Sequence, residues 1–357
     1  MRLRHELGVP LALLVVVIGA LGAGCGGSDD GRSNDNEEVV LVTHDSFAIP
    51  KQVKNAFERE SGLKLRILQG GDAGEAVNRA LLTNGNPQGD VLFGIDNNLL
   101  SRALDEELFE PYEATGLDRV DSRFLLDPTH RVTPIDHGDV CLNIDRKWFA
   151  SRRIATPKSL DELTKPSYHK LLVVENPATS TPGLAFMLAT VARFGENGWQ
   201  PYWRGLRANG VLVVDGWEEA YTARFSGAGG SKGTRPIVVS YATSPAAEVI
   251  FAAKPGAAAP TAVVDDSCFR QIELAGVLAG AKNVAGAHAL IDFMLRERFQ
   301  VSVADSMFVL PVRTGTPLPD AFRRYAVSPQ RPLELPAAEI GRNRDRWIDE
   351  WTQTVLR

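Results

Sequence analysis

The sequence has few cysteines, few histidines and no excess of positive charge. Cys25, Cys141 and Cys268 are the only cysteines in the chain, and its 6 histidines are scattered. Scattered histidines argue against a compact metal site. The formal net charge of -5 argues against nucleic acid as a partner.

Several motifs of catalytic sites are also missing. The chain contains neither the G-x-S-x-G pattern of serine hydrolases nor the H-E-x-x-H pattern of zinc proteases. His44, Asp45 and Ser46 are adjacent, and neighbouring residues of an extended segment point to opposite faces, which disfavours a catalytic triad. The glycine-rich run Gly227–Thr234 lacks P-loop spacing. We therefore expect no enzymatic activity and no cofactor.

A basic and then apolar segment opens the chain. Two arginines precede an apolar run from Leu7 to Leu21, which is followed by three small residues and Cys25. This order is typical of a secretory signal, and the apolar run is short for a membrane span. We predict a signal peptide at residues 1–24. The small residues before Cys25 resemble the lipobox of bacterial lipoproteins, in which the cysteine is lipidated; an ordinary cleavage site is the alternative.

The segment after Cys25 is polar. Residues 26–38 are rich in glycine and contain no apolar side chain, so we expect residues 25–38 to form a flexible tether. About 320 residues then remain, enough for two medium domains. In an oxidising compartment Cys141 and Cys268 either form a disulfide or remain as two buried thiols.

Strands and helices alternate along the first folded stretch. The expected strands are Val39–Thr43, Leu63–Leu68 and Asp90–Gly94, and the expected helices are Pro50–Glu60 and Glu75–Leu82. Such alternation predicts an α/β fold with a parallel sheet.

The second half continues this pattern. Thr133–Phe149 is expected to be a long extended crossing between domains, and Trp347 and Trp351 are expected to anchor a C-terminal helix. The other expected strands are Leu171–Val174, Val211–Val214, Pro236–Ser240 and Cys268–Ala279, and the other expected helices begin at Ser159 or cover Leu184–Phe194, Glu218–Phe225 and Gly286–Phe299.

Polar loops follow the first three strands. They are His44–Phe47, Gly70–Ala73 and Asp96–Asn98. Ligands of such sheets bind beyond the carboxyl ends of the strands. Each loop supplies an acid beside a small or amide side chain, which suits a polar or cationic ligand. Each could equally be a turn or a helix cap.

The segment Glu175–Gly183 links a predicted strand to a predicted helix. Its hydroxyl residues Thr179, Ser180 and Thr181 are N-cap types, and Gly183 allows a ligand to approach the backbone. Free N–H groups at a helix start attract anions. A capped surface helix that binds nothing is the alternative.

Six ordered motifs together resemble the thiamine-binding subunits of bacterial ABC importers. The motifs are HDSF (44–47), GIDNNLL (94–100), IDHG (135–138), TSTPG (179–183), GWEEAY (216–221) and SYATSP (240–245). The resemblance implies a two-lobed type II periplasmic-binding-protein fold with the ligand cleft between the lobes. Lobe 1 is expected at residues 39–136 plus 245–357, and lobe 2 at residues 137–244.

The resemblance also implies roles for individual residues. Trp217, Tyr241 and Phe308 match an aromatic enclosure for the thiazolium cation. Asp72 matches an acceptor for the aminopyrimidine, and His44 stands where the family usually has tyrosine. The residues that match the phosphate end are Ser180, Thr181 and Gly183.

From the resemblance we expect an extracytoplasmic monomer, anchored to the membrane through lipidated Cys25. It would bind thiamine or its phosphates and deliver them to permease and ATPase subunits. A Cys141–Cys268 disulfide is expected near the hinge, with Cα atoms within about 7 Å. The alternative ligand is another small cationic or phosphorylated compound: a polyamine, a phosphonate or ferric ion. Ferric sites normally use neighbouring tyrosines, whereas the run at Tyr241 has only one.

Overall fold

The computed structural model describes residues 37–252 and 258–357. The predicted signal peptide, Cys25 and nearly all of the tether therefore lie outside the described residues. Within the described ranges, no helix combines the length and the apolar character needed to cross a membrane.

The first half of the chain builds one side of a mixed sheet. Strands β1 and β2 are parallel and in register from Glu38↔Lys64 to Thr43↔Gln69, and β3 pairs with the other side of β1. The buried faces of α1 and α2, which include Val53 and Phe57 of α1 and Val77 of α2, cover these strands. The elements are β1 (Glu38–Thr43), α1 (Lys51–Ser61), β2 (Lys64–Gln69), α2 (Ala73–Leu82), β3 (Val91–Asp96), α3 (Leu100–Asp105) and β4 (Phe109–Glu110).

The middle of the chain builds the other side of the sheet. Strands β6, β7 and β8 are parallel to one another, with β6 in the centre. The elements are β5 (Thr133–Asp145), α4 (Arg146–Arg152), β6 (Leu172–Glu175), α5 (Thr181–Phe194), α6 (Trp199–Ala208), β7 (Leu212–Val214), a π-helical turn (Glu219–Arg224), β8 (Ile237–Tyr241) and α7 (Ser244–Ile250).

The last part of the chain contributes to both sides. Its elements are β9 (Thr261–Leu278), α8 (Val284–Met294), α9 (Glu297–Ser306), β10 (Leu310–Pro311), α10 (Asp320–Tyr325) and α11 (Ala337–Val355). Helix α8 packs on β1, whereas α10 packs on α7 and α11 packs on both α6 and α3. The full strand order is β2-β1-β3-β9-β5-β8-β6-β7, with β10 beside β5 and β4 beside β9.

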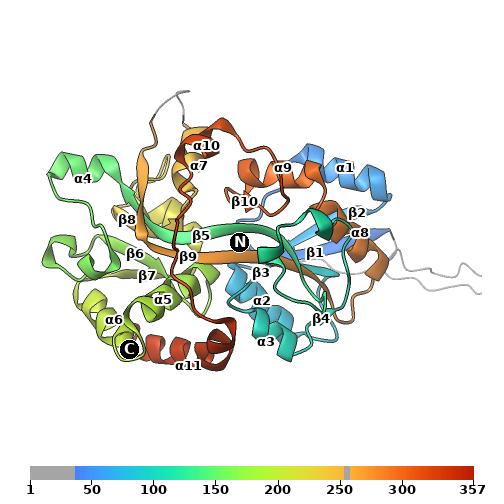
Figure 1. The fold of residues 1–357 in the computed structure, drawn as a ribbon, viewed down its shortest axis with the longest axis horizontal. Coiled ribbons are helices and arrows are strands. Elements are labelled where there is room, and N and C mark those ends of the chain that lie inside the picture. Colours follow the sequence, from blue (N-terminus) through green and yellow to red (C-terminus); the bar gives the residue numbers. More distant parts are fainter. Residues whose placement is uncertain (1–36, 253–257) are drawn as a thin grey trace, which may run out of the picture. The chain divides into compact units, whose positions relative to one another are not determined.

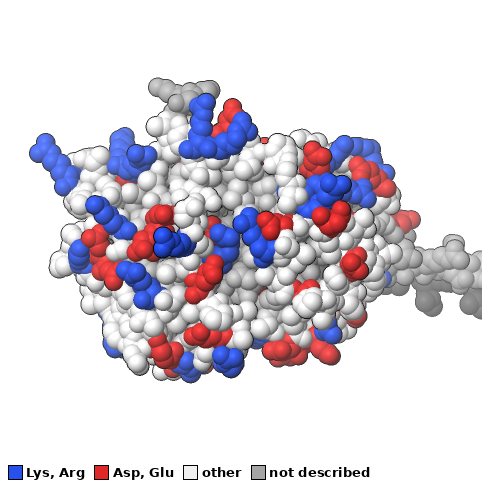
Figure 2. Space-filling model, viewed as in Figure 1, with Lys and Arg blue, Asp and Glu red and all other residues white. Residues whose placement is uncertain are grey.

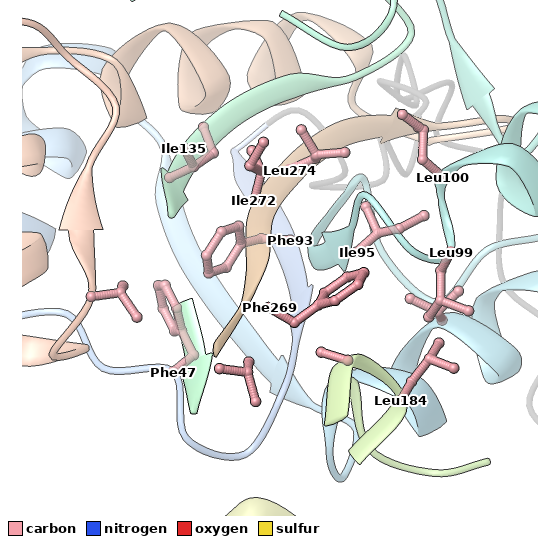
Figure 3. Close-up of a cluster of buried hydrophobic side chains, with 14 of the residues drawn as sticks. Phe47, Phe93, Ile95, Leu99, Leu100, Ile135, Leu184, Phe269, Ile272 and Leu274 are labelled. Atoms are coloured by element: carbon pink, nitrogen blue, oxygen red, sulfur yellow. The ribbon is translucent and has the colours of Figure 1, made fainter. Parts of the chain in front are cut away.

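Two long antiparallel strands, β5 and β9, join the two sides of the sheet. They run across the middle of the described fold, with helices on both faces (Figure 1). Their aromatic and aliphatic residues pack on those of β3 and of the loop after β1, and Figure 3 shows Phe47, Phe93, Ile272 and Leu274 in this core. The crossing strands thus hold one continuous apolar core.

The disulfide expected between the crossing strands is confirmed. Cys141 of β5 and Cys268 of β9 are bonded, with Cα atoms 4.2 Å apart. Both are fully buried and pack with Ala242. The prediction for the C-terminal helix is also confirmed, because Trp347 and Trp351 are fully buried on α11 and the Trp351 ring meets Trp203 of α6 at 5.3 Å.

Four predicted elements were wrong in extent. The strand predicted at Cys268–Ala279 is the longer β9, which begins at Thr261. The extended segment ends at Asp145, because that side chain accepts a hydrogen bond from the Trp148 N–H at 2.9 Å and caps α4. The helix predicted from Ser159 is a single turn at Leu160–Glu162. The helix predicted at Gly286–Phe299 is two helices, α8 and α9, which separate at Leu295 and Arg296.

Charged side chains of both signs are interspersed on the face drawn in Figure 2. Most of the described ion pairs join exposed partners, as Arg346 and Glu196 do at 2.7 Å. Exposed pairs of this kind contribute little to stability, typically less than about 1 kcal/mol each.

Candidate functional site

A cavity of about 660 Å³ lies where the loops after the strands converge. Its volume is in the usual range for small-ligand sites. The loop after β1, the residue before α2, the start of α5, the loop after β7 and the end of β8 all reach it. Six of the residues expected from the sequence line it: His44, Asp72, Thr181, Trp217, Tyr241 and Phe308.

Aromatic side chains form one wall of the cavity. The rings of Trp217 and Tyr221 stack at 5.2 Å with 15° between their planes, and Tyr241 lies 6.2 Å from Trp217. The Trp217 indole N–H donates to Ser240 Oγ at 2.9 Å, and the Tyr221 hydroxyl donates to Glu248 at 2.9 Å. These bonds fix the ring orientations, so the wall is formed before any ligand enters.

Phe308 reaches the cavity from the segment between α9 and β10. It packs on Phe251, with ring centroids 5.0 Å apart. Its backbone is left-handed, with φ 62°, a conformation that costs a residue other than glycine about 1 kcal/mol or more. The fold therefore holds Phe308 in an unfavourable conformation that presents it to the cavity.

The described lining of the cavity is acidic. It includes no lysine or arginine, whereas six carboxylates contribute to it: Asp45, Asp72, Glu218, Glu248, Glu273 and Asp305. Together with the aromatic wall, this lining provides negative charge and π-faces, which are the features that attract an organic cation.

Asp72 bridges the two sides of the sheet. It precedes α2, and its carboxylate accepts hydrogen bonds from the Trp217 N–H at 2.9 Å and the Thr181 N–H at 3.3 Å. Burial raises the pKa of Asp72 to about 6, although these bonds act in the opposite direction. The carboxylate is therefore ionised at neutral pH, at the edge of the cavity.

The start of α5 differs from the sequence-based expectation of an open anion site. Asp72 takes the Thr181 N–H, Ser180 Oγ accepts from the Gly183 N–H at 3.4 Å, and Gln271 donates to Thr181 Oγ1 at 2.9 Å. Ser180 and Gly183 lie outside the described cavity lining. A Cβ on Gly183 would lie 2.7 Å from the Glu175 carbonyl oxygen, so the close approach at this glycine is made by the protein's own backbone.

His44 occupies the end of β1 in a buried position. Its Nδ1 is 2.8 Å from Ser46 Oγ, and its Nε2 is 3.9 Å from Glu273 Oε1. Burial lowers the pKa of His44 to about 4, so the imidazole is neutral at pH 7. Gly94, with φ 106°, makes room for the ring, because a Cβ there would lie 2.6 Å from His44 Cδ2.

Several lining residues were not foreseen from the sequence, among them Tyr221, Glu248, Phe251 and Glu273. Tyr221 follows Trp217 by four positions within the GWEEAY motif, and that spacing was a usable signal. Glu273 gave no such signal, because it lies inside an apolar strand. In the opposite sense, the predicted loop Asp96–Asn98 does not line the cavity; Asp96 is fully buried beside it.

No group of three or more histidine, cysteine, aspartate or glutamate side chains is placed to hold a metal ion within the described ranges.

Comparison with known proteins identifies the family. A model of bacterial extracellular solute-binding proteins matches residues 86–334. The chain belongs to this family. The thiamine-binding periplasmic protein of Salmonella typhimurium is 31% identical over 324 residues, which cover 89% of this chain and 94% of that protein.

Solved structures of periplasmic binding proteins have a similar fold. A periplasmic thiamin binding protein superposes with a TM-score of 0.77 at 28% identity, covering 90% of this chain and 96% of its own. Iron-bound HitA from Pseudomonas aeruginosa has a TM-score of 0.66 at 17% identity, over 89% of this chain and 99% of its own. The family member described here therefore has the two-lobed type II periplasmic-binding-protein fold, with its cleft between the lobes, and belongs with binding proteins rather than enzymes.

Proposed function

We propose that this solute-binding protein captures thiamine outside the cytoplasm and delivers it to an ABC importer, without catalysis of its own. The observation that carries the proposal is the cavity, which combines three stacked or adjoining aromatic rings with six carboxylates and no described lysine or arginine. Thiamine-binding relatives at about 30% identity support the same ligand.

The chemistry of thiamine fits the two parts of this lining. Its thiazolium ring is a permanent cation, and each aromatic face that meets it contributes about 0.5–2 kcal/mol. Trp217, Tyr241 and Phe308 are proposed to enclose that ring. Asp72 is proposed to accept a hydrogen bond from the exocyclic amine of the pyrimidine. Neutral His44 adds a polar face without repelling the cation.

We further propose that unphosphorylated thiamine is preferred over its phosphates. The Asp72 carboxylate accepts a hydrogen bond from the Thr181 N–H, and Ser180 Oγ accepts one from the Gly183 N–H. These N–H groups in the first turn of α5 therefore already have acceptors. A phosphate at this place would also meet the Asp72 carboxylate. Ser180 and Gly183 are therefore assigned a supporting role, in which they shape the helix start behind Thr181.

The remaining parts of the proposal concern the cell. We propose that lobe 1 comprises residues 39–136 and 245–357 and that lobe 2 comprises residues 137–244. The two lobes of one monomer close on the ligand. Anchoring through lipidated Cys25 would keep the protein beside its permease. The Cys141–Cys268 disulfide supports an oxidising, extracytoplasmic location.

A thermal-shift series tests the ligand assignment. Thiamine at about 100 times its Kd should stabilise the protein by about 2.7 kcal/mol and raise its melting temperature. Thiamine monophosphate and diphosphate should give smaller shifts at equal concentration. A larger shift with a phosphate than with thiamine would overturn the proposed preference.

A polyamine is the second candidate ligand, and the six carboxylates of the lining favour it. Spermidine in the same series distinguishes the two, because it carries positive charge but no aromatic ring to stack on Trp217. A shift with spermidine and none with thiamine would replace the proposed ligand.

A further inference from the structure

Three acidic side chains lie abreast on neighbouring strands beside the cavity. Glu273 of β9 is the register partner of Asp96 on β3 and of Asp136 on β5. Directly paired residues of adjacent strands present their side chains on the same face. Glu273 lines the cavity, whereas Asp96 and Asp136 are fully buried on either side of it.

Two β-bulges create this row. The register between β3 and β9 shifts between Phe93 and Ile95, and the register between β5 and β9 shifts between Pro134 and Asp136. Without the extra residue in each strand, Ile95 and Ile135 would be the partners of Glu273. Each bulge therefore places an aspartate, instead of an isoleucine, opposite Glu273. Bulges next to functional sites often redirect a side chain in this way.

The three acids differ in their hydrogen bonds. Asp96 accepts from four donors at 3.0–3.1 Å, which are the N–H groups of Asn98 and Leu99 and the side-chain amides of Asn98 and Gln271. Both carboxylate oxygens of Asp136 are buried without a hydrogen-bond partner among the described residues.

His44 lies beside Glu273. Its imidazole is neutral at pH 7, and its Nε2 lies 3.9 Å from Glu273 Oε1 and has no hydrogen bond of its own within the described structure. Both oxygens of buried Asp136 and the His44 nitrogen thus lie beside Glu273 with unfilled hydrogen-bonding capacity, which is costly unless a proton or a ligand fills it.

The surroundings of Glu273 are almost entirely acidic. The titratable groups that face it are Asp96 from β3, Asp136 from β5, Asp72 from the residue before α2, His44 from the loop after β1 and Tyr241 from β8. Among the described ion pairs, none joins Glu273, Asp96 or Asp136 to a lysine or arginine.

Neutralisation by a proton follows from this geometry. Burial raises the pKa of Glu273 well above its usual range, and the neighbouring Asp136 raises it further. Burial likewise raises the pKa of Asp136. Two like charges so close in a buried site cannot both be ionised without a counter-charge.

We propose that Glu273 is the carboxylate that neutralises the bound cation, and that the proton shared by Glu273 and Asp136 in the empty protein leaves when the cation enters. This inference rests on the proposed cationic ligand. One positive charge enters the cavity and one proton goes to solvent, so the charge of the site is conserved. Because protons are released, binding strengthens as the pH rises, by at most about tenfold per pH unit for one proton.

Calorimetric titration of thiamine at neutral pH, in phosphate and in Tris buffer, measures the proton directly. The two buffers differ in ionisation enthalpy, so the difference in observed heat gives the number of protons released. The wild-type protein should release protons. Glu273→Gln should bind about tenfold more weakly, the scale of a lost interaction with a charged group, and lose most of the release.

Two further variants keep the result interpretable. Glu113→Gln makes the same change at an exposed position outside the cavity lining and should match the wild type. Asp136→Asn removes the neighbouring acid without touching the ligand; it should still bind thiamine with reduced proton release, and it decides the matter if Glu273→Gln does not fold.

The outcomes separate the inference from the function on which it rests. No thiamine binding by folded wild-type protein would contradict the proposed function. Thiamine binding without proton release, or unchanged release in the folded variants at Glu273 and Asp136, would overturn the role of this pair and leave the proposed ligand standing.

Discussion

The start of α5 and the acid row of Asp96, Glu273 and Asp136 are two polar regions next to the same cavity, and they differ in how their polar groups are satisfied. At the helix start the N–H groups of Thr181 and Gly183 have acceptors from the protein. In the acid row, Asp136 has no described partner and Glu273 meets only the histidine nitrogen.

The polar groups of the helix start therefore serve the fold, whereas those of the acid row remain able to interact with a ligand or a proton. Hydrogen bonds made within the protein stabilise the fold, and an added ligand group gains little from groups that are already paired. Buried groups left without partners carry a cost that a ligand or proton can remove. The predictions below perturb one region or the other, from the largest expected effect to the smallest.

Removal of the disulfide should have the largest effect on stability, and it perturbs the strands that carry the acid row. Cys141 and Cys268 join the two strands that carry Asp136 and Glu273. The double variant Cys141→Ala/Cys268→Ala should lose about 2–4 kcal/mol in the free energy of unfolding, measured by denaturant titration. Unchanged stability relative to the oxidised wild type would show that the crossing strands do not depend on this bond.

Trp217→Ala removes the central aromatic face from the cavity. Thiamine binding should weaken at least tenfold, or by about 1.4 kcal/mol, in calorimetry. Trp148→Ala is the matched control, because Trp148 lies on α4 under the Arg152 guanidinium, outside the cavity lining. Equal affinity for the wild type and Trp217→Ala would remove Trp217 from the proposed site.

Glu175→Gln tests an unpaired acid that does not reach the cavity. Both Glu175 oxygens are buried without described partners, and burial raises the pKa of Glu175 well above its usual range. The folded pKa exceeds the unfolded one, so ionisation costs stability as the pH rises. As the pH rises from about 6.5 to 8, the wild type should therefore lose more stability than Glu175→Gln.

The histidines do not disturb that comparison. Burial lowers the pKa of His44 to about 4 and that of His137 to about 3, so their contribution to stability rises up through the unfolded pKa of about 6.5, equally in the wild type and in Glu175→Gln. Melting curves at both pH values provide the measurement. Proton release on thiamine binding should stay at the wild-type value in Glu175→Gln; a loss there would show that unpaired acids outside the cavity also serve the ligand.

The smallest predicted change is the one in ligand preference caused by Asp72→Ala. Without the carboxylate, the Thr181 and Trp217 N–H groups are free to meet an anion. The affinity for thiamine phosphate relative to thiamine should rise about two- to fivefold, the scale of an anion at a helix start. Asp45→Ala removes another lining carboxylate without opening the helix start and serves as the control. An equal change in both variants would point to general charge rather than to the helix start.

Much of the fold follows from local patterns. The loops after β1 and β2 were predicted from apolar runs that end in polar residues, and their side chains His44 and Asp72 do line the cavity. These segments are short and buried, so periodicity and loop position were sufficient. Trp217 and Tyr241, which the family resemblance implied, line the cavity as well. The breaks at Asp145 and Leu295 depend on a cap and a helix junction, and local apolar spacing does not reveal these.

The two polar regions could not be predicted because they depend on long-range pairing. Asp72 accepts the hydrogen bond from the Thr181 N–H although it lies 109 positions earlier in the chain. The TSTPG motif alone could not show that the N–H groups at the start of α5 already have acceptors. Glu273 meets Asp96 and Asp136 only because a bulge on each side changes the register. A shift of one residue in a strand reverses which side chains face each other.

Calorimetric titration of the folded wild-type protein with thiamine, thiamine monophosphate and spermidine is the most direct measurement. We predict saturable binding of one thiamine per chain, with higher affinity than for the monophosphate or spermidine, and affinity that rises with pH. Absence of saturable thiamine binding, or tighter binding of either of the other two compounds, would contradict thiamine as the ligand of this acidic aromatic cavity.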